Sequence, residues 1–460
     1  MTCTASYRRP EGIGNLTSLA LLRIMNNKRL TGSIPRSIGQ LKQLAVLDLG
    51  ILGLDGAIPA EIGNLTRLED LSLGGNNLTG SIPPEIGRLE KVTSLYLSGN
   101  NLTGSIPREI GNITELQIII SLADNHLEGE LPLTLSQLVK LTALFVSNNQ
   151  LEGHIATQLG NKSSLNDIEI FSEIPSWIAE SLPKVRFLRL SSNMFDGTIP
   201  QQIFKLRQLQ LLDLSHNKLK GPVPVDFTNL VGMTQEQQGE IIYDNLHLER
   251  IQLVWKNADY IYSKTIAFVI GIDLSCNSLS QWIPEGLTTL HGLRYLNLSK
   301  NNLTGGIPED IGNLAMLESL DLSWNQISGQ IPPSFADLKF ISSLNLSNND
   351  LSGRIPTGSQ LQTLADPSIY DNNLGLCGLP LKECTNATAS THNQRSQDGA
   401  RETLWLYCFV VAGFIFGFWL SWGILFCNKM WRYALYKYVD NTQKKIAKKK
   451  AAYRRSRART

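Results

Sequence analysis

The sequence predicts a solenoid, a curved rod of stacked turns with one short strand per turn, followed by a single transmembrane helix. Two observations predict this fold class. A motif of about 24 residues recurs along most of the chain, and an uncharged apolar run at 404–427 stands directly before a basic tail. Of the 460 residues, 42% are hydrophobic and 18% are charged, which excludes a disordered chain.

The repeat unit reads LxxLxLxxNxLxGxIPxxIGxL, as in residues 68–89. We count its copies by the apolar residue before the proline, which recurs with a constant period in the clearest stretches. This counting predicts thirteen turns, marked by Ile34, Ile58, Ile82, Ile106, Leu131, Ile155, Ile174, Ile199, Val223, Ile283, Ile307, Ile331 and Ile355. A single turn cannot bury its own leucines, so we expect the turns to stack.

Each position of the unit has a mechanical role. The LxL pair predicts a short strand whose leucines point inward. The glycine allows a backbone conformation or a close approach that a Cβ would block, and the proline stops helix formation. The asparagine can bond backbone groups that the turn leaves unsatisfied. Ten turns keep it, as Asn76, Asn100, Asn125, Asn149, Asn193, Asn217, Asn277, Asn301, Asn325 and Asn349, whereas Lys28, Leu52 and Ile168 replace it in the others.

The LxGxIP extension resembles the plant-specific leucine-rich repeat, and the whole arrangement resembles a kinase-less plant receptor-like protein. The resemblance implies a right-handed superhelix of the α/β type, with repeats over 1–228 and 268–357. It also implies a cell-surface receptor that binds an extracellular peptide or protein ligand. Such a receptor signals through a partner receptor kinase of the adaptor or co-receptor type, in plant defence. Two alternatives stay open, namely a non-signalling inhibitor or decoy that binds microbial proteins, and a non-functional receptor fragment.

Two irregularities interrupt the period. Ile174 follows Ile155 after less than one full period, which predicts a shortened turn with a local packing defect. Residues 229–267 form a non-repeat insertion that resembles the island domain of receptor-like proteins. Lys256 and Tyr262 match a Lys/Tyr pattern of that family's islands, so the resemblance implies that they contact a ligand or partner. The alternative is a solvated loop that binds nothing.

Residues 358–385 resemble the family's C-terminal cap, and the resemblance implies a disulfide bond between Cys377 and Cys384. We expect Cys276 to be free. A juxtamembrane linker follows at 386–403. The N-terminus shows neither an apolar signal-peptide region nor the paired cysteines of the family's N-terminal cap, which favours a truncated chain.

The run 404–427 is long enough as a helix, about 36 Å, to cross a membrane of about 30 Å. A buried helix of a soluble domain is the alternative. Residues 428–460 contain 12 basic residues and one acidic residue, so the positive-inside rule predicts a cytoplasmic tail that also attracts anionic lipids. The protein is then a single-pass type I protein of the plasma membrane, provided that a signal peptide precedes this chain.

Small residues recur every fourth position in the span, at Gly413, Gly417 and Ser421. Such a face allows close helix packing, and in the resembled family it pairs with the span of a partner kinase. Glycines tolerated in a lipid-facing helix are the alternative. Ten glycosylation sequons precede the span, which fits an extracellular location: Asn15, Asn64, Asn77, Asn101, Asn112, Asn161, Asn297, Asn302, Asn345 and Asn386.

The sequence contains no catalytic motif that we can identify, so we expect no enzyme activity, no cofactor and no metal site. The histidines form no HExxH pair, and phosphate-binding and nucleophile-elbow motifs are missing. The tail at 428–460 is too short for a kinase. Its basic residues suit lipids better than nucleic acid, because they follow a membrane span.

We expect ligand contacts on the concave face, where side chains alternate with the strand leucines. By register these are Tyr96, Phe145, Phe187, Arg189 and Asp213, followed by Tyr295 and Trp324. Aromatic and arginine side chains are typical anchors of interfaces. Glycans on Asn297 and Asn345 in the same column would shield the C-terminal part of this face.

Overall fold

A computed structural model describes residues 11–152, 174–234, 251–255, 258–262, 269–358 and 360–384. The chain divides into two compact units, 1–385 and 386–460, and all described residues belong to the first. The predicted span at 404–427, with Gly413, Gly417 and Ser421, therefore lies outside the described residues. Within the described residues, no helix is both long and apolar enough to cross a membrane.

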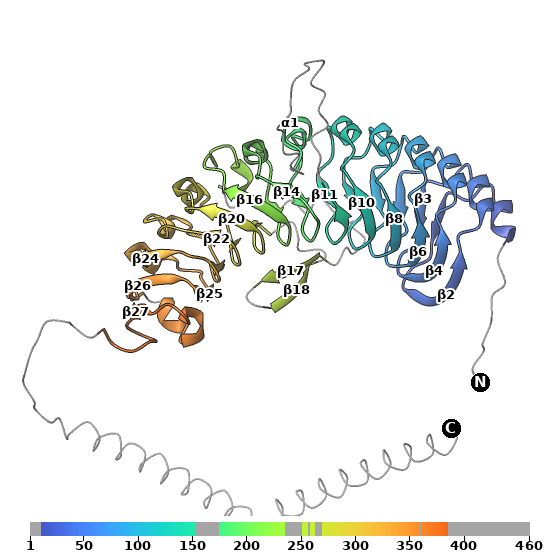
Figure 1. Ribbon diagram of the computed structural model, residues 1–460. Coiled ribbons are helices and arrows are strands. Elements are labelled where there is room, and N and C mark those ends of the chain that lie inside the picture. Colours follow the sequence, from blue (N-terminus) through green and yellow to red (C-terminus); the bar gives the residue numbers. More distant parts are fainter. Residues whose placement is uncertain are drawn as a thin grey trace, which may run out of the picture. The chain divides into compact units, whose positions relative to one another are not determined.

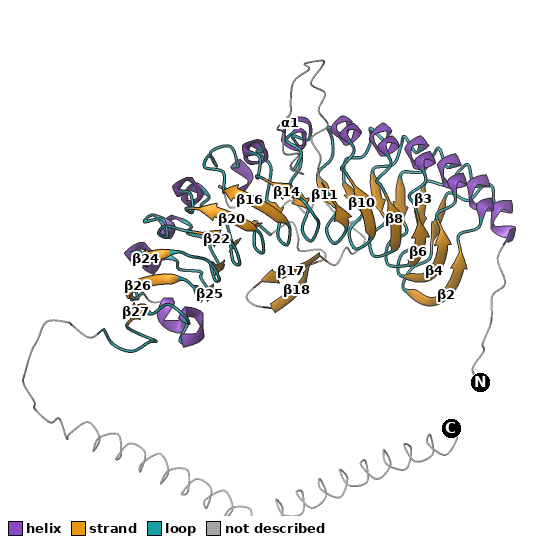
Figure 2. Cartoon of the chain, viewed as in Figure 1, coloured by secondary structure: helices purple, strands orange, loops and turns teal. Residues whose placement is uncertain are grey.

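The repeat unit folds as a solenoid with one strand per turn, as the sequence predicts, and these strands are parallel. Corresponding residues of successive turns pair in register, so that Val46 lies opposite Asp70 and Asp70 opposite Ser94, each pair one period apart along the chain. Figures 1 and 2 show these strands along the inner curve of the unit and the short helices along its outer curve. We call the strand side the concave face.

The main sheet has twelve strands in the described residues, arranged in chain order. They are β1 (Leu21–Arg23), β3 (Val46–Asp48), β5 (Asp70–Ser72), β7 (Ser94–Tyr96), β9 (Ile119–Ser121), β11 (Ala143–Phe145), β13 (Phe187–Arg189), β15 (Leu211–Asp213), β19 (Gly271–Asp273), β21 (Tyr295–Asn297), β23 (Ser319–Asp321) and β25 (Ser343–Asn345).

A second row of strands lies at or just after the asparagine position of the repeat, and the sequence did not predict it. The ten repeat asparagines, from Asn76 to Asn349, are called the ladder asparagines below. The second row is built by the NxLxG segments of the repeat, and its sheets are also parallel. Its strands are β2 (Asn27–Ser33), β4 (Leu52–Ala57), β6 (Asn77–Gly80), β8 (Asn101–Gly104), β10 (His126–Gly129), β12 (Gln150–Leu151), β14 (Asp196–Gly197), β16 (Lys218–Pro222), β20 (Ser278–Gln281), β22 (Asn302–Leu303), β24 (Ser328–Gln330), β26 (Asp350–Arg354) and β27 (Gly375–Cys377).

Most turns then form a short 3-10 helix that begins directly after the repeat proline. Pro83, for example, precedes η4 in an extended conformation, and its carbonyl accepts a hydrogen bond from the Ile86 N–H at 3.0 Å. The proline thus ends the strand and starts the helix. The 3-10 helices are η1 (Glu11–Asn15), η2 (Arg36–Gln40), η3 (Ala60–Asn64), η4 (Pro84–Arg88), η5 (Arg108–Asn112), η6 (Leu133–Gln137), η7 (Gln201–Lys205), η8 (Val231–Met233), η10 (Glu285–Thr289), η11 (Ile311–Asn313), η12 (Pro333–Asp337), η13 (Leu361–Thr363) and η14 (Pro367–Tyr370), and α1 (Trp177–Ser181) is α-helical.

The ladder asparagines join neighbouring turns, as their predicted role requires. The Asn301 amide donates to the carbonyls of Leu274 and Leu298 at 3.0 and 3.1 Å, and its Oδ1 accepts from the Leu279 N–H at 3.0 Å. The other nine predicted asparagines repeat this pattern, which links each turn to the one before it. An eleventh member, Asn373, was missed because it lies in the cap, where it bonds Leu346 and Leu351 in the same way.

The prediction of two separate turns at Ile155 and Ile174 is wrong. β11 pairs directly with β13, Ala143 opposite Phe187, a step of almost two periods, whereas its other neighbour β9 is one period away. The asparagine ladder crosses this step intact, because the Asn193 amide donates to Val146 O at 3.0 Å. Ile174 is buried in the core as the isoleucine of the turn that β11 begins, so this turn is almost twice the usual length rather than shortened. Residues 153–173, including Ile155 and Ile168, lie outside the described residues.

The second irregularity also leaves the main sheet uninterrupted. β15 pairs directly with β19, Asp213 opposite Asp273, across a step of more than two periods. Within that step, β17 (Ile251–Trp255) and β18 (Ala258–Tyr262) form an antiparallel pair in which Tyr262 lies opposite Ile251. Lys256 lies outside the described residues, so the proposed island contacts stay a prediction.

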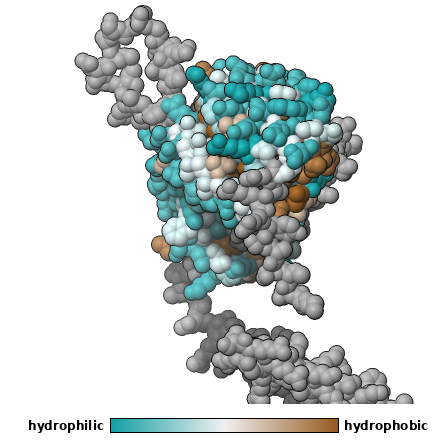
Figure 3. Space-filling model, turned by 90° about the vertical axis from the view of Figure 1, so that its right-hand side faces the viewer, coloured by the Kyte–Doolittle hydropathy of each residue, from teal (hydrophilic) through white to brown (hydrophobic). Residues whose placement is uncertain are grey.

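The two ends of the repeats differ. Near β1, Leu16, Leu21 and Ile24 are exposed, and Figure 3, which faces this end, shows apolar patches within a mostly hydrophilic surface. At the other end, β27 adds to β26, and Tyr370 and Leu376 are buried against the last turn. A disulfide bond joins Cys377 to Cys384 there, and Cys276 is free.

Candidate functional site

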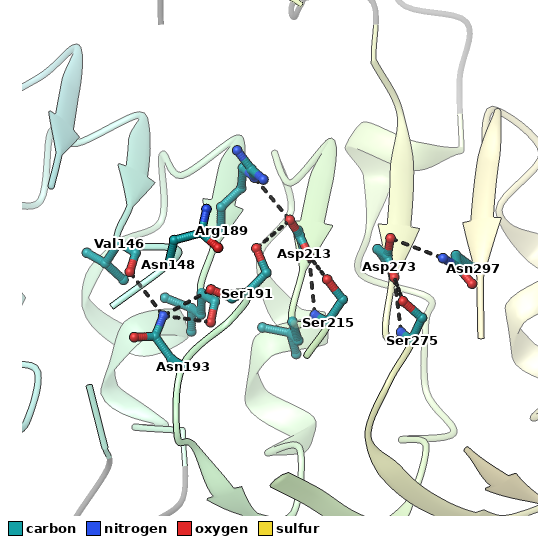
Figure 4. Close-up of polar contacts among 12 residues, drawn as sticks. Val146, Asn148, Arg189, Ser191, Asn193, Asp213, Ser215, Asp273, Ser275 and Asn297 are labelled. Atoms are coloured by element: carbon teal, nitrogen blue, oxygen red, sulfur yellow. Dashed lines mark hydrogen bonds and ion pairs between the residues drawn. The ribbon is translucent and has the colours of Figure 1, made fainter. Parts of the chain in front are cut away.

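Polar side chains on the concave face cap the ends of the main-sheet strands. The carboxylate Oδ1 of Asp213 accepts hydrogen bonds from the Ser215 N–H and hydroxyl at 3.2 and 2.7 Å. Asp273 binds Ser275 in the same way (Figure 4). Asn297, Asp321 and Asn345 also bind the serine two residues later. These side chains stabilise the turn that follows each strand.

Arg189 and Asp213, two predicted ligand contacts, form an ion pair across β13 and β15. The Arg189 Nε lies 3.0 Å from Asp213 Oδ2, which also accepts the Ser191 hydroxyl at 2.7 Å (Figure 4). Asp213 is buried and Arg189 nearly so. The two opposite charges therefore pair with each other inside the protein, and neither side chain offers a free charge to a ligand.

A second carboxylate lies opposite this ion pair. Asp273 on β19 faces Asp213 and accepts a hydrogen bond from the Tyr295 hydroxyl at 2.7 Å. Burial and the neighbouring Asp213 raise the pKa of Asp273 to about 6. Burial, then the negative charge of Asp273, holds the pKa of Tyr295 well above its usual range, so Tyr295 remains a donor.

Four of the five aromatic side chains predicted on the concave face are buried, which corrects that prediction. Tyr96, Phe145 and Phe187 are 3%, 1% and 2% exposed. They belong to a second apolar cluster, separate from the leucine core, together with Ile119, Ala143, Leu211, Val269 and Tyr295. Alternation along each strand correctly excluded them from the leucine core, but it could not show that they are buried among themselves.

Exposed side chains occur instead in a rim column, which we define as the residue directly before each ladder asparagine; Cys276 and Asn348 in this column are only partly exposed. From β15 onward it contains His216, Cys276, Lys300, Trp324, Asn348 and Asn372, all with φ between 53° and 58°. Their backbones are held by the next turn, since the N–H of Lys300 donates to Ser323 O at 2.8 Å. Trp324 is 59% exposed, and His216 and Lys300 are exposed as well.

Sequence reasoning named Trp324 but missed His216 and Lys300, although the position before the asparagine marks the whole column. A backbone held in the left-handed region restricts the orientation of each side chain. From β15 onward, the column can therefore present one variable side chain per turn at a regular spacing along the edge of the main sheet, whereas Gly75 and Gly99 occupy it in two earlier turns. Such a row can contact an extended peptide.

The sequons differ in accessibility. Asn15, Asn77, Asn101, Asn112 and Asn302 are exposed, and Asn64 and Asn345 are partly buried. Asn297 is buried and its amide donates to Asp273 Oδ2 at 3.3 Å, so this site does not suit a glycan. The expected shielding of the concave face by a glycan on Asn297 is therefore wrong. Asn161 and Asn386 lie outside the described residues. In the described part of the chain, no three His, Cys, Asp or Glu side chains are grouped to hold a metal ion.

Comparison with known families identifies leucine-rich repeats along the chain. A family model described as "Leucine-rich repeat region" matches residues 1–184. Models described as "Leucine rich repeat" match residues 271–327, 208–230 and 340–360. These matches fall in both repeat blocks that the period of the sequence predicts.

Among curated proteins, the chain is 45% identical over 291 residues to the receptor-like protein EIX2 of Solanum lycopersicum, covering 59% of this chain and 28% of that protein. It is 51% identical over 207 residues to EIX1 of the same species, covering 43% and 20%. The chain thus spans less than a third of the length of these relatives.

Two solved structures share its fold. The plant peptide hormone receptor RGFR1 in complex with RGF2 has a TM-score of 0.59 and 29% identity, covering 82% of this chain and 53% of that one. PEPR1–AtPEP1 has a TM-score of 0.57 and 31% identity, covering 82% and 46%.

Proposed function

We propose that this chain, which belongs to the leucine-rich-repeat family of plant receptor-like proteins, acts as a cell-surface receptor for an extracellular peptide or protein. The rim column carries this proposal. It combines an exposed tryptophan, lysine and histidine with backbones that the next turn holds in place. The solenoid of this chain resembles that of a plant peptide hormone receptor, with 29% sequence identity, and this similarity supports a peptide ligand.

The chain signals, in this proposal, by recruiting a receptor kinase through its span, in plant defence. The similarity to EIX2 and EIX1 supports a receptor role, and the uncharged run at 404–427 followed by twelve basic residues supports a membrane anchor. The small residues Gly413, Gly417 and Ser421 support recruitment through the span, because such a face allows a partner helix to pack closely.

The ligand proposal is tested with the full chain, expressed behind a secretory leader in plant cells and captured from detergent. A library of synthetic peptides matching plant and microbial secreted proteins is the probe. We expect the Trp324→Ala and Lys300→Ala variants to weaken the binding of any captured peptide, about tenfold for the tryptophan. The matched control is Phe340→Ala, which removes a similarly exposed aromatic side chain (55%) from the turn before β25, away from the rim column.

A library without a binding peptide, or equal affinity for all three variants, contradicts the rim column as the ligand surface.

The recruitment proposal is tested separately by co-precipitating kinases from membranes. Gly417→Leu should reduce kinase recovery because an isobutyl group holds a partner helix away, whereas Phe416→Leu should not. Equal recovery with both variants would exclude the glycine face as the docking surface.

A further inference from the structure

One turn departs from the repeat at two adjacent positions on the second row of strands. In every other turn whose residue at this position is described, a glycine has positive φ, whereas here Gln281 adopts φ 68°. The next position holds Trp282, where neighbouring turns have Gly306 or Pro222. Trp282 is 57% exposed. A strained backbone beside an exposed tryptophan indicates a functional surface better than either feature alone.

Trp282 forms a wall between two hollows. One has a volume of about 330 Å³ and is lined by Ile199, Pro222 and Val225. The other, of about 430 Å³, is bounded by Gly306 and by two exposed carboxylates, Glu285 and Glu309. An aromatic face next to hydrogen-bond acceptors is the combination that suits a sugar, whose ring has an apolar C–H face and a rim of hydroxyl donors.

A sequon lies on the strand beside this wall. In the pairing of β20 with β22, which Figure 1 shows side by side, Ser280 lies opposite Asn302. The N–H of Thr304 donates to Gln281 O at 2.7 Å, so Thr304, the third residue of the sequon, comes alongside Trp282. Leu303 is buried, whereas Asn302 and Thr304 are exposed. Asn302 and Trp282 are therefore diagonal neighbours, a separation that long side chains can bridge.

We propose that the N-glycan on Asn302 packs its core sugars against Trp282, with the hydroxyls directed to Glu285 and Glu309. This inference rests on the proposed extracellular location, because only an exported chain is glycosylated. The other sequons of the second row lack such a wall. A Cβ added to Gly305 would meet Trp282 Cβ at 3.3 Å, and equivalent atoms at Gly80 and Gly104 would meet Ala57 and Ser81. Ala57 beside Asn77 and Ser81 beside Asn101 thus occupy the place of Trp282.

The test follows glycan release from the folded full chain, made with high-mannose glycans in plant cells behind a secretory leader. An endoglycosidase that cuts between the two core sugars is added, and site-specific mass spectrometry reads Asn77, Asn101 and Asn302. We expect release at Asn302 to be about fivefold slower than at the other two sites, the size expected of one aromatic contact. Trp282→Ala should bring Asn302 to their rate, and Ala57→Trp should slow release at Asn77.

Phe340→Ala, which removes a similarly exposed aromatic side chain (55%) from the turn before β25, is the matched control and should leave the Asn302 rate unchanged. Equal release rates at all three sites, or an Asn302 rate that Trp282→Ala does not change, overturn the inference. Glycans on Asn77 and Asn101 but none on Asn302 overturn it as well, while the extracellular location stands. Absence of glycans from all three sites contradicts the extracellular location itself.

Discussion

The ladder asparagines are single residues that satisfy several backbone groups of two turns. Asn301 is buried, and its side chain serves the carbonyls of Leu274, Leu298 and Ser299 and the N–H of Leu279. In a solenoid each turn contacts only its neighbours. These hydrogen bonds therefore stabilise the interface that holds neighbouring turns together.

Replacing Asn301 by alanine should lower the free energy of unfolding by at least about 2 kcal/mol, because each buried group left unsatisfied costs about 1–3 kcal/mol. Urea unfolding of the purified chain, followed by tryptophan fluorescence, measures the change. Gln326→Ala is the control, since Gln326 is exposed and lies one position after the next ladder asparagine. A loss of similar size in both variants would mean that the ladder does not hold the turns together.

Asp273 makes stability depend on pH. Its pKa of about 6 in the folded chain exceeds the ordinary value of 3.8, so the folded state binds the proton more tightly than the unfolded state. The resulting stabilisation is complete below pH 3.8 and is lost as the pH rises through 6. Between pH 7 and pH 5 the free energy of unfolding should therefore increase by about 1 kcal/mol from this group.

Asp321 contributes in the same direction, because burial raises its pKa. The Asp273→Asn variant retains the other titratable groups nearby. These are the carboxylates of Asp213, which faces residue 273, and of Asp321, and the phenol of Tyr295. That variant should show a smaller increase between pH 7 and pH 5. Urea midpoints at the two values provide the measurement, and an unchanged increase in the variant would assign the pH dependence to other groups.

At the scale of the element, the repeat contains two glycines with different physical roles. Gly80, at the end of β6, has φ 76°, and an added Cβ would lie 3.6 Å from Ala57 Cβ, which is ordinary contact. Gly87, in η4, has no such backbone requirement, but a Cβ there would lie 2.7 Å from Glu109 Cβ and even closer to the Glu109 carbonyl in η5. One glycine is needed for its conformation and the other for the close packing of successive helices.

Asparagine substitutions should separate these two roles. Gly80→Ala should cost about 1 kcal/mol through backbone strain, and Gly80→Asn should recover most of it because asparagine tolerates the left-handed region. Gly87→Ala should cost about 1–3 kcal/mol through overpacking, and Gly87→Asn at least as much. Urea midpoints of the four variants test this. Recovery by asparagine at Gly87 would show that the helices can move apart.

At the scale of the whole molecule, the charge distribution predicts the topology. The tail carries twelve basic residues and the sequons all precede the uncharged run. With a secretory leader added, we expect a glycosidase to lower the apparent mass of the chain and external protease to spare the tail. Asn297 should carry no glycan, because its amide is buried and bonded to Asp273. An unglycosylated product with an externally accessible tail would contradict the proposed location.

The sequence by itself determined the repeating part of this protein. The period of the repeat predicted one strand per turn, the buried leucines and the bonding of backbone groups by the repeat asparagines. These features depend on positions within one turn and on an identical neighbour, which periodicity describes completely. The family resemblance added the cap and its cysteine pair, which the structure places against the last turn.

Only the tertiary structure showed how turns of unequal length pair in the sheet and which side chains of the concave face are buried. The isoleucine–proline motif at Ile174 and its counterpart at Ile155 suggested separate turns, but β13 pairs with β11 and leaves no place in the sheet for a second one. Tyr96, Phe145 and Phe187 alternate correctly with the core leucines, yet they are buried in a cluster of their own on the concave face. Alternation assigns a side chain to a face of the sheet, whereas its exposure depends on side chains brought beside it from other turns.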